Sequence, residues 1–505
     1  MKIFLPLVCA VMLVASTAWC ADGTLVVCDD VADPLTLDPH RQFSEKNHTL
    51  VRQIYDGLVR FDADGNIEPA LAVRWERLDP VRMRFHLRHD VVFHNGEQFN
   101  AEAARFSIMR YFDPAIQFPA AAFLASIARV EVVDEHTIEI VTEHPDGLLL
   151  NRLAAFVLIV PPKYIAEKGA DALHSHPVGT GAFRFEEWKQ SERIVLSANQ
   201  SYWMSGFPKV ERLIFRFAPL EKQVEMLLSG EADLVTELPG TMTRLVEESP
   251  KTRIIKQRTF WTVGATMRTD RGPLADVRVR RALNLAINAD DLVRFDSMGN
   301  GSVLASLTMP GQGGHNPDLE RYAHNVDAAR ALMKEAGVQT PLVLRTLVRA
   351  QSERTARILA VQLAKIGVQI DIKAVFSDAD VIRGLQAEEW DLAIAGLPDP
   401  MCHSFFIQSI LLASQSPFSL QRDPAFDQKL IAVVMELDDE KREAAGRELD
   451  AYVHENALSL FTYQKIKTYG RSADLNFRPH ISGMPHFFDV DFAVPQRAEV
   501  PVDGP

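Results

Sequence analysis

The stretch ARILAVQLAKIGVQIDIK (356–373), followed by WDLAIAG (390–396), decides the fold. Its first part repeats apolar residues at helical spacing and ends at Gly367, a residue type common at helix C-termini. After Gly367 the period changes to the alternation of a β-strand. The apolar residues that carry the two periods are Leu359, Leu363 and Ile366, then Val368, Ile370 and Ile372. Together with the helical stretch that follows and the buried strand WDLAIAG, this order predicts an α/β domain.

Length and composition limit the possible functions. The chain has 505 residues, enough for two or three domains. Its 47% hydrophobic and 24% charged residues are typical of a globular protein. A formal net charge of −13 argues against nucleic-acid binding, which requires a basic surface. The motifs HExxH, GxSxG and GxxxxGK[ST] are absent from the sequence, so no common catalytic pattern favours an enzyme.

Residues 1–21 have the pattern of a cleavable signal peptide. The apolar run IFLPLVCAVMLVA is followed by the small residues of STAWCADG. Cys20 does not suit lipid attachment, because Trp19 precedes it where a small residue is required. We therefore expect an exported, soluble protein that is not a lipoprotein. Cys28 and Cys402 then remain in the mature chain, either free or bridged.

The segment GLPDPMCHSFF (396–406) places several reactive side chains at the end of the strand WDLAIAG. Open α/β domains bind ligands outside the carboxyl ends of their strands. Asp399, Met401 and His403 are therefore candidate ligand contacts. Imidazole and thiolate groups suit nickel, copper or zinc, so His403 is also a candidate metal ligand. The alternative is a proline-stiffened loop in which His403 hydrogen-bonds to the backbone.

Further segments, in this order, resemble the family 5 extracellular solute-binding proteins of bacterial ABC importers, which include dipeptide-, oligopeptide- and nickel-binding proteins. They span nearly the whole mature chain. The segments that carry the resemblance are LDPH (37–40), IYDGLVRFDADGNIEPALAVRWE (54–76), FHLRHDVVFHNGEQFNAEAARFS (85–107), PVGTGAFRFEEW (177–188), NQSYW (199–203), PLADVRVRRALNLAIN (273–288) and HNVDAARALMKEAG (324–337).

The resemblance implies a two-lobed α/β periplasmic binding protein of class II, or cluster C, with a ligand cleft between the lobes and an extra inserted domain. The implied parts are lobe I (22–48, 174–262 and 461–505), the inserted segment (49–173) and lobe II (263–460). It also implies a periplasmic monomer without a cofactor, which is not an enzyme. Such a protein closes about a hinge on a small solute and delivers it to ABC permease subunits in the inner membrane.

The resemblance also bears on the ligand. In peptide-binding members, a Gly-Trp and then an Asp that pairs with the peptide's amino terminus follow the strand that corresponds to WDLAIAG. In this sequence Leu397 occupies the position of that Trp, and the part of the loop that would contain the amine-binding Asp is missing. Asp399 or Asp378 could take the role after a loop shift, whereas the shortened loop is more similar to the nickel-binding members. We expect a peptide or peptide-like solute, with nickel or a metal chelate as the alternative. A solute sensor or an enzyme comes after these.

Two further segments supply candidate ligand contacts. The stretch TFWTVGATM (259–267) lies at the crossing between the lobes in the family and implicates Phe260, Trp261 and Thr262. Trp261 either stacks on the ligand or packs against the hinge. The first loop of lobe I, where family members contact extended ligands, adds the aromatic residue of its Gln42-Phe43 pair. His40 and His48 near this loop are expected at the surface.

Overall fold

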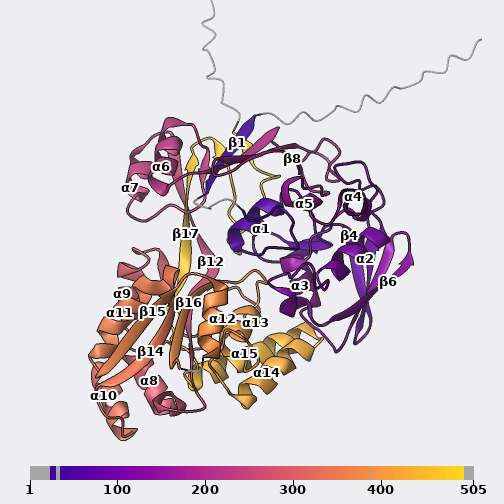
Figure 1. Ribbon diagram of the computed structural model, residues 1–505. Coiled ribbons are helices and arrows are strands. Elements are labelled where there is room, and N and C mark those ends of the chain that lie inside the picture. Colours follow the sequence, from indigo (N-terminus) through magenta and orange to yellow (C-terminus); the bar gives the residue numbers. More distant parts are fainter. Residues whose placement is uncertain (1–22, 30–33, 388, 494–505) are drawn as a thin grey trace, which may run out of the picture.

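The computed structural model describes residues 23–29, 34–387 and 389–493, so the predicted signal peptide, residues 1–21, lies outside the described residues. A mixed β-sheet extends from one end of the protein to the other (Figure 1). Its strands, in spatial order, are β15 (Val368–Val375), β14 (Leu342–Arg349), β16 (Leu392–Pro398), β12 (Thr252–Met267), β17 (Tyr463–Ser472), β11 (Leu234–Val235), β1 (Thr24–Asp29), β10 (Arg212–Phe217), β9 (Arg193–Ala198) and β8 (Phe183–Lys189), with β13 (Gly301–Val303) paired to β17.

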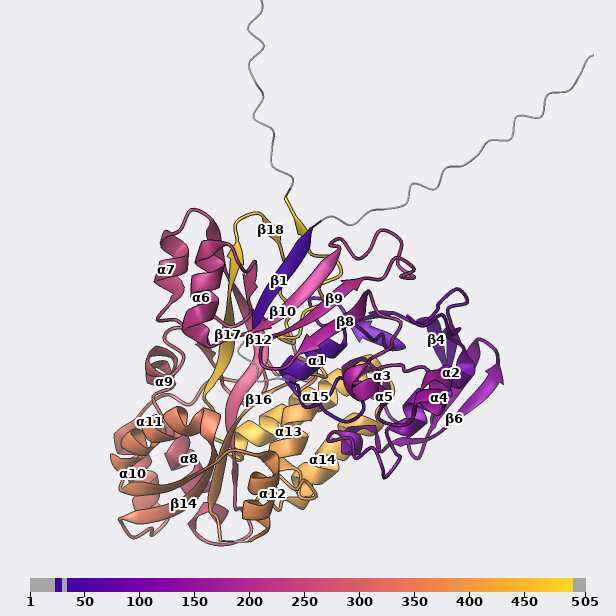
Figure 2. The same cartoon turned by 45° about the horizontal axis from the view of Figure 1, so that its top comes forward.

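Two long strands, β12 and β17, connect the lobes. Residues 252–258 of β12 pair with β17, and residues 261–267 pair with β16. The register between β12 and β17 shifts between Arg258 and Thr262. The strand therefore changes its main partner at the crossing that the resemblance implies. Beyond β17, the lobe I strands β1, β10, β9 and β8 lie side by side (Figure 2).

The helix and strands predicted from residues 356–396 are confirmed. The helix α11 (Glu353–Ala364) precedes β15, and Gly367 between them has a φ of 79°, in the left-handed region that favours glycine. The strand β14 pairs in parallel with both β15 and β16. The carboxyl ends of these strands therefore lie along one edge of the lobe II sheet.

Helices pack around the two ends of this sheet. Those of lobe II are α8 (Val277–Ala286), α9 (Ala289–Phe295), α10 (Val326–Glu335), α11, α12 (Asp378–Gln386), α13 (Phe405–Leu412), α14 (Pro424–Met435) and α15 (Asp439–Glu455). Those of lobe I are α1 (Glu45–Val51), α6 (Leu220–Ser229) and α7 (Thr243–Glu248), and a small pair of strands there is β18 (Leu475–Asn476) and β19 (Asp491–Phe492).

The inserted segment contains a four-stranded antiparallel sheet of its own. Its strands, in spatial order, are β4 (Ala72–Asp79), β5 (Arg82–Leu87), β7 (Thr137–Thr142) and β6 (Ile127–Asp134). The strands β2 (Val59–Phe61) and β3 (Ile67–Pro69) form a separate pair, and the helices are α2 (Ala101–Arg110), α3 (Leu149–Phe156), α4 (Pro162–Lys168) and, just beyond the segment, α5 (Ala172–Ser175). Asn100 caps α2 by accepting from the Ala103 N–H at 3.0 Å.

The inserted segment packs directly on lobe II. One hydrophobic cluster includes residues of both, and the rings of Phe123 and Phe406 lie 4.6 Å apart. The Gly147 N–H donates to the Val434 carbonyl at 2.7 Å. These contacts close one side of the space between the lobes. The boundaries assigned to the three parts stay a prediction.

Three further expectations concern single residues. Cys28 and Cys402 are both free and buried. The expected surface positions of His40 and His48 are wrong, because both side chains are buried. The ring of His40 hydrogen-bonds to the Leu158 carbonyl at 2.8 Å, which compensates its removal from water. In the part of the chain that the structure describes, no helix is long and apolar enough to span a membrane.

Candidate functional site

A cleft of about 890 Å³ lies where β12 and β17 join the two lobes. Its volume is within the range of small-molecule binding sites. Both lobes and the inserted segment contribute to its wall. The residues used below are Phe43, Glu45, Lys46, Phe123, Glu237, Trp261, Asp296, Arg349, Arg354, Thr355, Leu397, Pro398, Phe406, Tyr463 and Lys465.

Trp261 lies at the register shift of β12 and lines the cleft. Its ring crosses the neighbouring strand β16 at Gly396, where an added Cβ would lie 2.3 Å from the Trp261 Cζ2 atom. The ammonium of Lys465, on β17, lies 5.1 Å from the centre of the ring. The two roles expected for Trp261 are therefore compatible, because the ring packs on the hinge strands and also borders the cleft.

Aromatic rings form one wall of the cleft. Phe43 belongs to lobe I, Phe123 to the inserted segment and Phe406 to α13. Phe156 links them, with ring centres 5.1 Å from Phe43 and 5.4 Å from Phe123. This wall offers an apolar surface to a ligand, while its residues hold the inserted segment against lobe II.

Charged residues also line the cleft, and the carboxylates among them already have partners. Glu45 pairs with Lys467 at 2.7 Å, and Glu237 pairs with Lys465. Asp296 accepts from the Tyr463 hydroxyl at 2.7 Å and from Thr355 at 2.5 Å. Burial raises the pKa of Glu237, but Lys465, Lys467 and Lys46 outweigh it and lower the pKa to about 2. The residue is therefore anionic at neutral pH.

Two guanidinium groups lie at the carboxyl edge of the lobe II sheet. Arg349 is the last residue of β14, and Arg354 is on α11. Burial lowers the pKa of Arg349, yet an arginine stays cationic at neutral pH. Sequence reasoning missed Arg349 and Lys465 as cleft residues. The rule that singled out Asp399, a strand end in an α/β lobe, applies equally to Arg349.

Of the predicted ligand contacts, Trp261 and Phe43 line the cleft. The others are buried beside it, each less than one tenth exposed: Phe260, Thr262, Asp399, Met401 and His403. The Thr262 hydroxyl donates to the Tyr463 carbonyl at 2.9 Å. The side chain of Asp378 lies outside the described residues. The role of the five buried residues in ligand binding stays a prediction that mutagenesis can test.

Asp399 and His403 have partners within the protein. Asp399 accepts from the Gln312 side chain at 2.6 Å and from the Met401 N–H at 2.8 Å, and burial raises its pKa to about 7. His403 accepts from the Phe405 N–H at 3.1 Å. Burial, with Arg442 and Arg152, lowers the pKa of His403 to about 3, so the ring is neutral at neutral pH. No group of three His, Cys, Asp or Glu residues in the described ranges is placed to hold a metal ion.

Comparisons with known proteins identify the family. The model of the bacterial extracellular solute-binding proteins, family 5, middle region, matches residues 66–416. The glutathione-binding protein GsiB of Pectobacterium atrosepticum is 26% identical over 369 residues, which cover 72% of this chain and 71% of that protein. The di/tripeptide-binding protein 2 of Pseudomonas aeruginosa is 27% identical over 476 residues, which cover 86% and 88%.

A solved structure supports the same assignment. The ABC transporter-associated periplasmic binding protein DppA of Helicobacter pylori, in complex with the peptide STSA, matches with a TM-score of 0.80 and 25% identity, over 94% of this chain and 99% of that one. The predicted two-lobed α/β fold is confirmed by this similarity. These relatives are binding proteins, which agrees with the absence of catalytic motifs from the sequence. The chain belongs to the family 5 extracellular solute-binding proteins, which serve ABC importers.

Proposed function

We propose that this protein captures a peptide or peptide-like solute in the cleft and delivers it to an ABC permease. The observation that carries the proposal is that one cleft is lined by both lobes and by the inserted segment. A solute that contacts both lobes binds the closed form more tightly than the open form and so shifts the population toward closure. The named ligands of the relatives, glutathione, di/tripeptides and the peptide STSA, are of this chemical class.

The charged residues of the cleft differ in how they can bind the carboxylate and the amino group of a peptide. A guanidinium can bind a carboxylate through two parallel hydrogen bonds, which makes Arg349 the candidate partner for the ligand's carboxylate. The carboxylates Glu45, Glu237 and Asp296 are each held by groups of the protein. A ligand's amine would therefore have to compete with these existing partners for a carboxylate. We expect the dissociation constant of an N-acetylated peptide to be within about threefold of that of the free peptide. This difference is smaller than the roughly 1.4 kcal/mol that corresponds to a tenfold change.

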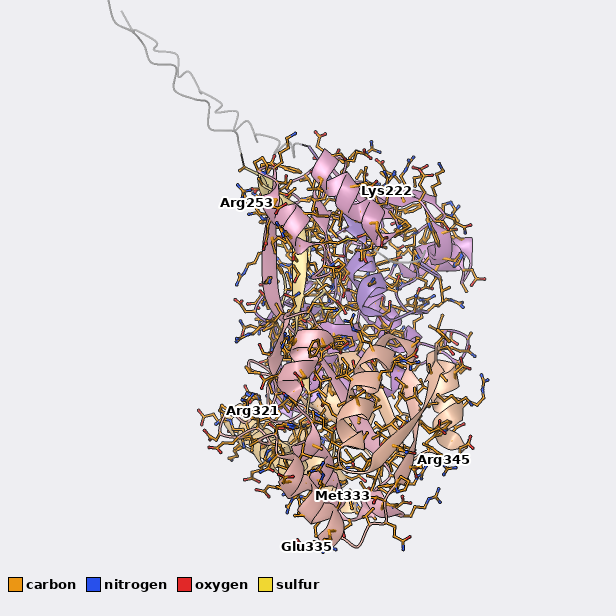
Figure 3. All side chains as sticks on the ribbon, turned by 90° about the vertical axis from the view of Figure 1, so that its left-hand side faces the viewer. Lys222, Arg253, Arg321, Met333, Glu335 and Arg345 are labelled. Atoms are coloured by element: carbon orange, nitrogen blue, oxygen red, sulfur yellow. The ribbon has the colours of Figure 1, made fainter. Side chains whose placement is uncertain are left out.

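Calorimetry of the purified protein with di-, tri- and tetrapeptides tests the proposal. Arg349→Gln is expected to weaken binding by about 2 kcal/mol or more, roughly 30-fold, because it leaves a ligand carboxylate without its charged partner. Arg345→Gln is the matched control, since Arg345 is on the same strand but half-exposed and 3.7 Å from Asp391 (Figure 3). Unchanged affinity in Arg349→Gln would show that the carboxylate binds elsewhere.

Native mass spectrometry of protein purified from its host provides the second test. Co-purification of a peptide supports the proposal. Absence of peptide affinity, combined with binding of nickel plus histidine that His403→Ala abolishes, would contradict it and support the metal-chelate alternative.

A further inference from the structure

Five nitrogen-bearing side chains gather where α1 and β2 meet the loop of residues 480–486. All are nine-tenths buried or more. Their exposed fractions are 3% for His48, 6% for Arg52, 8% for Arg60, 6% for His480 and 7% for His486. We call this group the basic cluster. None of its members lines the cleft described above.

The loop that carries two of the histidines is fixed by its backbone. The Ile481 N–H donates to the Ala63 carbonyl, and the Phe260 N–H donates to the Ile481 carbonyl, both at 2.9 Å. Arg52 donates through Nη1 to the Met484 carbonyl at 3.0 Å. The loop is thereby held between α1, the turn after β2 and the hinge strand β12.

The side chains of the cluster lie close to one another. The rings of His480 and His486 are 5.6 Å apart, and the ring of His486 is 5.3 Å from that of Phe488. The guanidinium of Arg60 lies 4.7 Å from the centre of the Phe488 ring. His48 precedes Arg52 by one helical turn, and the Arg52 N–H donates to the His48 carbonyl.

Each member leaves a buried nitrogen without a hydrogen-bond partner in the protein. These atoms are His48 Nε2, Arg52 Nε, Arg60 Nη1, His480 Nδ1 and His486 Nε2. An unsatisfied buried polar atom costs about 1–3 kcal/mol, and most such atoms in native proteins are paired with protein or with a bound species. A concentration of five in one place indicates that something other than protein pairs with them.

The charges of the cluster favour a negatively charged species. Arg60 has a carboxylate partner, Glu68, at 2.6 Å. Arg52 has none among the described residues, and its guanidinium donates to the Met484 carbonyl instead. Burial lowers the pKa of Arg52 to about 10, with Cys402 raising it and Arg60 lowering it, so the group is a cation at neutral pH. A buried cation without a counter-charge is unfavourable, and a negative species relieves it.

The histidines supply further donors. Burial, with the nearby Arg52 and Arg60, lowers the pKa of His480 to about 3. The same causes hold the pKa of His486 well below its usual value, and burial and Arg52 do so for His48. Each ring is therefore neutral and has one N–H to donate. A metal cation is disfavoured here, because two arginines are among its neighbours.

We propose that the basic cluster binds one small inorganic anion, such as chloride, between the Arg52 guanidinium and the N–H groups of His48, His480 and His486. The anion joins α1 to the 480–486 loop. Because that loop hydrogen-bonds to Phe260 on β12, the anion also stiffens the lobe I side of the hinge. This site is separate from the solute cleft, and its occupation does not depend on which solute the protein carries.

Thermal unfolding of the purified mature protein tests the site. In sodium chloride the midpoint is expected to rise and then saturate, relative to sodium methanesulfonate at equal ionic strength, because a ligand of the native state stabilises it by mass action. Arg52→Met is expected to lose this chloride-specific rise. Arg478→Gln should retain it, since Arg478, two residues before the loop, is exposed and forms an ion pair with Asp64. Equal chloride dependence in the parent protein and Arg52→Met would overturn the proposal.

Crystals of the unmodified protein soaked in sodium bromide give a result that does not depend on any variant folding. An anomalous bromide peak within hydrogen-bonding distance of Arg52 and the three histidines supports the site. Water alone at that position, with bromide found only at the surface, would overturn it.

Discussion

Within the single segment 396–406, neighbouring residues have opposite surroundings. Leu397, Pro398 and Phe406 line the solute cleft. Asp399 and His403, between them in sequence, are buried and bonded to the protein itself. These two polar side chains, which the sequence suggested as ligand contacts, are thus bonded within the protein, whereas the three apolar side chains border the cleft.

Backbone contacts explain why the segment turns away from the cleft. After Pro398, the Asp399 N–H donates to the Phe260 carbonyl at 2.6 Å, which binds the chain to the hinge strand. Cys402 has a φ of 53°, and its carbonyl accepts from the Gly313 N–H at 3.3 Å. These bonds direct residues 399–403 into the protein and return the chain to the cleft at α13. The difference between the two sides therefore follows from the loop's backbone, and variants on each side can test it.

The largest effect is expected for Asp399→Ala. The change leaves the Gln312 amide and the Met401 N–H without their acceptor in a site that water does not reach, at about 1–3 kcal/mol for each unsatisfied group. We expect the free energy of unfolding to fall by roughly 3–4 kcal/mol, measured by urea denaturation. Pro398→Ala, the cleft-side neighbour, is the control and should lose less than half as much. Equal losses in the two variants would contradict the division of the segment.

Trp261→Ala tests the cleft side at the other hinge strand. The ring borders the cleft and lies under the Lys465 ammonium, and loss of a central aromatic contact typically weakens binding by 2 kcal/mol or more, about 30-fold. Calorimetry with the best-binding peptide measures the change. Trp261→Phe keeps an aromatic face and should recover most of the affinity. If Trp261→Ala binds as tightly as the parent protein, the ring serves the hinge alone.

Periodic patterns in the sequence predicted individual helices and strands, because such patterns report which face of an element is buried, whereas the two-lobed fold was implied by the family resemblance. The alternation of residues 368–373 and the helical spacing before it predicted α11, β15 and β16. The same patterns carry no information on partners far apart in the chain. Pairing of β17 with both β11 and β12 came only with the structure.

The sequence predicted the place of the cleft and two residues that line it, Trp261 and Phe43, but within residues 396–406 it did not predict which side chains border the cleft. The strand-end rule led to residues 396–406, which do border the cleft. The strand-end rule did not predict that Leu397 lines the cleft while Asp399 does not. That difference depends on hydrogen bonds of Asp399 to Phe260 and Gln312, which are distant in sequence. Arg349 escaped notice because its strand, β14, was not recognised from the sequence, so the strand-end rule was not applied there.

His403→Asn tests the buried side through pH. Burial, with Arg442 and Arg152, lowers the pKa of His403 from its ordinary value of 6.5 to about 3 in the native state. Between these two pH values the unfolded chain therefore binds a proton that the native ring does not. Stability linked to this ring is therefore complete above pH 6.5 and decreases as the pH falls toward 3. Between pH 6.5 and 5 the parent protein should lose about 1.5 kcal/mol more than His403→Asn, whose amide oxygen can still accept from the Phe405 N–H. Parallel pH profiles for the two proteins would mean that the ring is protonated normally when folded.

Met401→Leu should have the smallest effect. The Met401 side chain is fully buried. Its backbone makes the polar contacts, with its carbonyl accepting from the Asn151 side chain at 2.9 Å and its N–H donating to Asp399. Exchange of buried residues of similar volume usually costs less than about 1.5 kcal/mol. We expect unfolding free energy to change by less than that and peptide affinity to stay within twofold, about 0.4 kcal/mol. If the Met401 thioether contacted the solute or a metal, Met401→Leu would weaken binding, because leucine supplies no sulfur ligand. A tenfold loss of affinity for peptide, or for nickel plus histidine, would move Met401 to the cleft side and remove the contrast within residues 396–406.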